Sequence, residues 1–180
     1  MLNLPSLFYG SINPSFFQPD VLHIIGLSLF FIIVIYRCFS FLNLNLGWIF
    51  VVLGIVIFAT EPLYSNWNLN SLPNLVSSYM IKGYGGVFYL FPWLGYVFWG
   101  AAIAYFFKNR YSNYHKWILP FLCSGLILIF LSSPFLNYLG NLLPLLLFQK
   151  IAWNNFLFIR LGDVLVLLGL FMGFASQIKI

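Results

Sequence analysis

The stretch Val21–Tyr36 reads VLHIIGLSLFFIIVIY, and His23 is its only basic or acidic residue. A helix needs about 20 apolar residues to cross about 30 Å of hydrocarbon, and this stretch approaches that length. Asp20 precedes it where an N-cap residue belongs, and Arg37 follows it at the other end. The stretch therefore predicts a membrane-spanning α-helix.

The composition of the whole chain points the same way. Of its 180 residues, 62% are hydrophobic and 6% are charged, whereas soluble domains carry about 25% charged residues. The aromatic content of 22% supplies too much apolar surface for a disordered chain. The net charge of +5 includes no run of basic residues, so it indicates membrane topology rather than nucleic-acid binding. A soluble globular domain is excluded.

Four further apolar stretches predict spanning helices, and the chain is expected to form a single all-α transmembrane domain over residues 1–180. These stretches are Leu46–Thr60, Val87–Phe107, Trp117–Ser132 and Phe156–Ala175. The segment Phe135–Gln149 is apolar but is interrupted by asparagine, glycine and proline. We interpret it as a re-entrant or interfacial segment, with a sixth span as the alternative. The prediction is a polytopic helical bundle of five spans, or of six if this segment crosses.

The basic residues indicate an orientation, because cytoplasmic loops are enriched in lysine and arginine. With the N-terminus outside, the cytoplasmic side holds Arg37, Lys108, Arg110, Lys116 and Lys179, against Lys82 and Lys150 outside. The N-terminus is therefore predicted to be extracytoplasmic. The two cysteines, Cys38 and Cys123, are expected to be free thiols in the core, with no disulfide and no metal site.

Ionisable residues within or beside a span are candidate site residues, because unpaired charge is costly there. Asp20 and His23 lie on one helix face, where a carboxylate can orient an imidazole for general-base catalysis. The alternative is that Asp20 caps the helix while His23 binds a carbonyl at the interface. Glu61, at the outer end of the second span, can face the same cavity.

Two other groups complete the candidates. Arg160 and Asp163 are spaced to pair on one helix, either lining a polar cavity that holds an anionic substrate group or only fixing helix packing. Lys108, Arg110 and Lys116, together with His115, can bind the phosphates of a nucleotide-like donor, or can serve only as the positive-inside signal. Separately, Gly100 and Ala104 form a small-xxx-small pair that predicts a close helix approach.

Three segments resemble a known family. Residues 20–28 (DVLHIIGLS) and 88–100 (FYLFPWLGYVFWG) are similar to motifs of the transmembrane acyltransferases, in particular the bacterial relatives of heparan-α-glucosaminide N-acetyltransferase, and residues 158–162 (FIRLG) resemble a third. The resemblance implies a multi-pass enzyme of the bacterial inner membrane that transfers an acyl group from acyl-CoA to a sugar outside. It implies no bound cofactor, and a histidine that acts as general base or acyl carrier.

The chain also departs from that family. Its only histidines, His23 and His115, do not match the family's catalytic histidine, and the family's late Gly-Arg-x-Ser-Leu region is missing. On this interpretation the chain is a middle portion that needs a preceding segment or a partner chain, and alone it is expected to show no acyl transfer. A small transporter or channel subunit, and a membrane assembly protein without chemistry, are the alternatives.

Overall fold

Helices are the only regular elements in the part of the chain that the structure describes. The computed structural model describes residues 19–42, 44–69, 72–80, 88–108, 115–142 and 146–177. Its helices are α2 (Val21–Phe39), η2 (Ser40–Leu42, a 3₁₀ turn), α3 (Leu46–Ala59), α4 (Glu61–Tyr64), α5 (Asn74–Met80), α6 (Leu90–Lys108), α7 (His115–Leu142), α8 (Leu146–Trp153) and α9 (Phe156–Gln177). The predicted all-α class is confirmed.

Four of these helices, α2, α6, α7 and α9, are long and apolar enough to cross a membrane. The predicted second span, α3, has 14 residues, or about 21 Å of helix, and is shorter than the hydrocarbon layer. Large apolar side chains cover the outside of the bundle; Phe130 is 70% exposed and Phe171 68%. The chain is a multi-pass membrane protein whose outer surface suits lipid rather than water.

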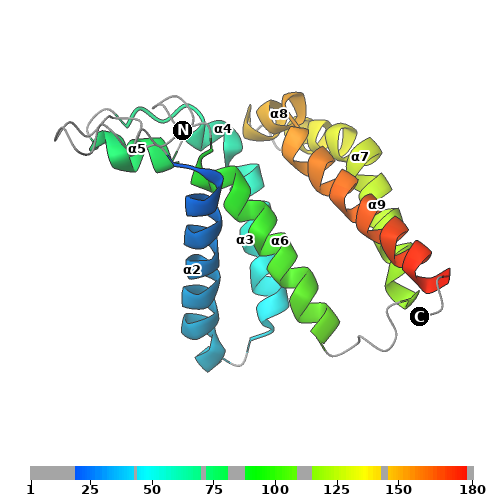
Figure 1. Cartoon of the computed structure of the whole chain (residues 1–180). Helices are drawn as coiled ribbons and strands as arrows, with labels where there is room; N and C mark the ends of the chain where they lie inside the picture. Colours follow the sequence, from blue (N-terminus) through cyan, green and yellow to red (C-terminus); the bar gives the residue numbers. More distant parts are fainter. Residues whose placement is uncertain are drawn as a thin grey trace, which may run out of the picture.

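The helices form two groups, with α2, α3 and α6 in one and α7, α8 and α9 in the other (Figure 1). The short helices α4, α5 and α8 lie at one end of both groups, which we call the α4 end. The opposite end holds the last turns of α2 and α6 and the first turn of α7, and therefore Arg37, Lys108 and Lys116. We call this opposite end the basic end.

Glycines allow the closest helix contacts in both groups. A Cβ added to Gly54 of α3 would lie 2.8 Å from the Trp99 ring of α6. In the other group, a Cβ on Gly125 of α7 would lie 2.8 Å from the Gly162 carbonyl oxygen of α9. At Gly100 an added Cβ would meet no described atom within 4 Å, so the predicted close approach at that position is wrong.

The helix α7 runs through Pro134, although the sequence predicted that the span ends before Ser133 and Pro134. Proline removes one backbone donor, and membrane helices tolerate this loss where neighbouring groups compensate. The carbonyl that loses its donor is that of Phe130; close to it in the helix, the Ser132 hydroxyl donates to the Leu128 carbonyl. The amide of Asn155, at the start of α9, donates to the hydroxyls of Ser132 and Ser133 at 2.6 and 2.9 Å.

The segment Phe135–Gln149 is consequently not one unit. Its first part, as far as Leu142, forms the last turns of α7, and its end lies in the eight-residue helix α8. The described part of this segment contains no separate helix long enough to be a sixth span. The helix α8 packs against α7 at the α4 end (Figure 1), where an interfacial segment would lie.

Candidate functional site

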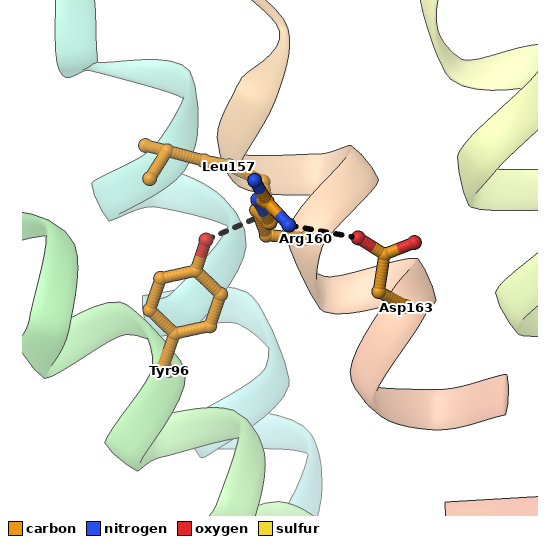
Figure 2. Close-up of polar contacts among 4 residues, drawn as sticks. All are labelled: Tyr96, Leu157, Arg160 and Asp163. Atoms are coloured by element: carbon orange, nitrogen blue, oxygen red, sulfur yellow. Dashed lines mark hydrogen bonds and ion pairs between the residues drawn. The ribbon is translucent and has the colours of Figure 1, made fainter. Parts of the chain in front are cut away.

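The predicted pair of Arg160 and Asp163 is present on α9. Arg160 Nη1 lies 3.5 Å from Asp163 Oδ2, and the two side chains are 73% and 41% exposed. One turn earlier, the carbonyl of Leu157 accepts a hydrogen bond of 3.1 Å from the Tyr96 hydroxyl of α6. Figure 2 shows the Arg160 guanidinium between this hydroxyl and the Asp163 carboxylate. The guanidinium has five N–H donors, so one ion pair leaves it able to bind a further acceptor.

Glu61 belongs to a second polar group, at the α4 end. Burial raises the pKa of the Glu61 carboxyl. Burial also raises the pKa values of Tyr64 and Tyr89, and the negative charge of Glu61 adds to both shifts. The Tyr64 ring stacks on Phe91 with centroids 5.1 Å apart, and its buried hydroxyl has no hydrogen-bond partner among the described residues. Glu61 is therefore partly buried, and its charge acts on two tyrosine hydroxyls.

Tyr96 connects these two polar groups. It lies within electrostatic reach of Tyr64 on one side and of Arg160 and Asp163 on the other. Arg160 and Asp163 of α9 are thus paired with each other, whereas no hydrogen bond or ion pair of the described residues joins Glu61 of α4 to them. We call the whole set the polar layer; it comprises Glu61, Tyr64, Tyr89, Tyr96, Arg160 and Asp163.

An apolar pocket of about 360 Å³ lies between α2 and α6. It is lined by Val21, Ile24, Ile25 and Ser28 of α2, and by Phe88, Trp93, Tyr96 and Val97 of α6 and the residues before it. Ser28 is fully buried, and its hydroxyl has no hydrogen-bond partner among the described residues. Tyr96 lines this α2–α6 pocket and also reaches α9 with its hydroxyl. The pocket and the polar layer therefore adjoin at Tyr96.

Asp20 and His23 each contact a different partner. The Asp20 carboxylate accepts a hydrogen bond of 2.7 Å from the Val21 N–H and caps α2. The His23 ring packs edge-to-face on Tyr79 of α5, with centroids 6.3 Å apart. Neither residue is among those that line the α2–α6 pocket. The described geometry shows the helix cap, and it places the imidazole against an aromatic ring.

The predicted donor-binding residues lie far from the polar layer. Lys108 ends α6 and Lys116 lies in the first turn of α7, whereas Arg110 falls outside the described residues. Tyr96 and Lys108 are separated by about 18 Å along α6 at 1.5 Å per residue. An extended donor would have to bridge this distance.

Metal and thiol chemistry are not indicated in the described part of the chain. Within those ranges, no three His, Cys, Asp or Glu side chains gather to hold a metal ion. Cys38 and Cys123 are free thiols as predicted, but they are exposed on the helix surfaces rather than buried in the core.

Sequence reasoning missed four residues of this region: Ser28, Tyr64, Tyr89 and Tyr96. Tyrosines near helix ends are typical of the membrane interface, so their positions in the sequence do not indicate any additional role. A usable signal was the position of Tyr96 inside a predicted span, where its hydroxyl needs a partner.

The fold and the site define a multi-pass helical membrane protein with an apolar pocket beside a polar layer. No protein-family profile matches the chain, and neither a curated protein nor a solved structure is significantly similar to it.

Proposed function

We propose that the chain is an acyltransferase-like membrane protein that serves transfer of an acyl group from acyl-CoA to a sugar. The observation that carries this proposal is the meeting of the three segments that resemble the transmembrane acyltransferases. Residues 20–28 and 88–100 include every residue that lines the α2–α6 pocket. The segment 158–162 adjoins it, because Tyr96 donates to the carbonyl of Leu157.

In this proposal the polar layer holds the acceptor. Tyrosine hydroxyls and carboxylates offer the donors and acceptors that sugar hydroxyls need. Arg160 provides charge-assisted binding for an anionic group on the acceptor.

Lys108, Arg110 and Lys116 are the proposed binding residues for the phosphates of acyl-CoA. Because acyl-CoA is cytoplasmic, this role requires the basic end to face the cytoplasm. The excess of basic residues at that end favours the same orientation, in which the N-terminus lies outside a bacterial inner membrane. Asp20 and Glu61 then lie on the outer side with the acceptor.

The general base is proposed to come from another segment or a partner chain. Asp20 is hydrogen-bonded to backbone, and His23 packs on Tyr79, so neither is poised to take a proton from an acceptor hydroxyl in the pocket. Alone, the chain is expected to bind acyl-CoA without transferring the acyl group.

The test uses the purified chain in lipid nanodiscs and acetyl-CoA binding measured by isothermal titration calorimetry. Replacing Lys108 and Lys116 together by glutamine should weaken binding about tenfold or more, because charge-assisted contacts to phosphate are lost. Lys150→Gln, at the α4 end, is the matched control and should bind as the native chain does. Absence of binding by the native chain, or equal loss in the control, would contradict the proposal.

A second measurement concerns the base. Radiolabelled acetyl should not pass from acetyl-CoA to glucosamine when the chain is alone. Transfer under those conditions would show that the chain itself contains the base, and His23 with Asp20 would then be the candidate.

A further inference from the structure

The α2–α6 pocket combines an apolar lining with one polar atom that nothing in the described structure satisfies. The lining side chains are aliphatic or aromatic, and their polar atoms are the hydroxyls of Ser28 and Tyr96 and the indole N–H of Trp93. The Tyr96 hydroxyl is bonded to α9, whereas that of Ser28 is buried without a partner. A buried hydroxyl in hydrocarbon is costly unless it forms a hydrogen bond. Ser28 therefore points to a ligand that brings an acceptor atom.

The position of the pocket restricts what that ligand can be. Its walls belong to α2 and α6, which are both long and apolar enough to cross a membrane, so a ligand would enter from the hydrocarbon layer. A free sugar would lose its hydration on entering such a lining, whereas a hydrocarbon chain would not. A hydrocarbon chain alone, however, would leave the Ser28 hydroxyl unsatisfied. The lining thus favours a chain with an oxygen atom along it.

The polar layer lies where the other end of such a ligand would be. Both α2 and α6 begin at the α4 end (Figure 1). Ser28 lies about 10 Å along α2 and Tyr96 about 9 Å along α6 from the first residue of each helix, at 1.5 Å per residue. The two side chains are therefore at similar depth, and the Tyr96 hydroxyl reaches from the pocket to the Leu157 carbonyl of α9, one turn before Arg160.

We propose that the acceptor is a lipid-linked sugar, whose hydrocarbon chain lies in the α2–α6 pocket and whose sugar lies in the polar layer. The Ser28 hydroxyl donates to the oxygen that links the two parts. That this ligand accepts an acyl group rests on the proposed acyltransferase function. That it is lipid-linked is inferred from the pocket, from Ser28 and from the position of Tyr96 between the pocket and the polar layer.

The experiment is photo-crosslinking to the full chain in phosphatidylcholine nanodiscs. The probe is dodecyl glucoside with a diazirine in its alkyl chain, and labelled peptides are mapped by mass spectrometry. Labelling is expected within residues 21–37 and 88–107, and excess unlabelled dodecyl glucoside should suppress it. Excess free glucose should not.

Two variants test the pocket itself. Val97→Phe fills the pocket and should reduce the labelling to background. Its matched control is Val164→Phe on α9, where Val164 is 53% exposed and does not line the pocket. Ser28→Ala leaves the volume nearly unchanged and removes an unsatisfied hydroxyl, so it should fold at least as well and lower the labelling about fivefold.

The outcomes separate this inference from the proposed function. Equal labelling by phosphatidylcholine with the same diazirine chain, competition by free glucose, or native labelling in both Val97→Phe and Ser28→Ala would overturn the inference. Such results would leave the proposed function intact if the chain still bound acetyl-CoA. Conversely, specific labelling of a chain that binds no acetyl-CoA would leave the lipid-linked sugar site standing without the acyltransferase function.

Discussion

Gly125 is the position where the smallest change should separate the two helices of the α7–α9 pair. In Gly125→Ala, the new Cβ would lie 2.6 Å from Val166 Cγ2, 2.8 Å from the Gly162 carbonyl oxygen and 3.0 Å from the Val166 nitrogen. Two of these atoms are backbone, so the helices must move apart. Overpacking of this kind costs about 1–3 kcal/mol. We expect the free energy of unfolding to fall by that amount.

The matched control is Gly100→Ala, which adds the same methyl group where no described atom lies within 4 Å. Alanine favours a helix over glycine by up to about 1 kcal/mol, so this variant should be equally stable or slightly more stable. Because both substitutions gain the same helix propensity, the difference between the two variants should be the overpacking cost of about 1–3 kcal/mol. Unfolding in mixed micelles, followed by circular dichroism against denaturant fraction, measures both values. A Gly125→Ala chain as stable as the Gly100→Ala chain would refute the close contact of α7 with α9.

Three further predictions concern other parts of the chain. Burial raises the pKa of Glu61 in the folded state above its ordinary value of 4.5. The folded protein therefore binds this proton more tightly than the unfolded chain does, and the resulting stabilisation is complete below pH 4.5 and is lost as pH rises through the raised pKa. Glu61→Gln should therefore gain stability relative to the native chain between pH 4 and pH 8 in micelle unfolding, and a difference independent of pH would contradict the burial of Glu61. Asn155→Ala loses two hydrogen bonds to serine hydroxyls of α7 and should lower the free energy of unfolding by about 1–3 kcal/mol; an unchanged value would mean that these bonds do not hold the hairpin. In a cysteine-free background, cysteine at Lys116 should react with an impermeant maleimide only from the cytoplasmic side, and cysteine at Lys150 only from outside; the reverse pattern would invert the orientation.

The sequence predicted the helical class and most helix positions because apolar length alone decides them in a membrane. It failed at Pro134, where proline and two serines read as a helix end. The helix continues through this proline, and Asn155, which is distant in sequence, hydrogen-bonds both serines. Local rules for proline cannot include a partner that only the fold supplies.

The prediction of close helix contacts and of the site from the sequence was limited for the same reason. The Gly100 and Ala104 spacing is visible within one helix, whereas the actual contact of Gly125 with Gly162 joins two helices with no shared pattern. Arg160 and Asp163 were predictable as a pair because they are one turn apart on the same helix. The hydrogen bond from Tyr96 of α6 to the Leu157 carbonyl of α9 lies beside that pair, and only tertiary structure reveals it.

The junction between the two helix groups has a consequence for how the protein is made. Each group contains its own tightly packed helix pair, α3 with α6 and α7 with α9. The groups join at the α4 end, where the Phe58 ring packs edge-to-face on Phe158 with centroids 5.4 Å apart and Tyr96 donates to Leu157. They also meet at the basic end, where the Phe107 ring of α6 stacks on Phe121 of α7. During synthesis the first group can therefore assemble in the bilayer before α7 and α9 emerge, and the second can dock onto it afterwards as a preformed hairpin. Two separately expressed halves, divided between Lys108 and His115, should then find each other in the membrane and copurify.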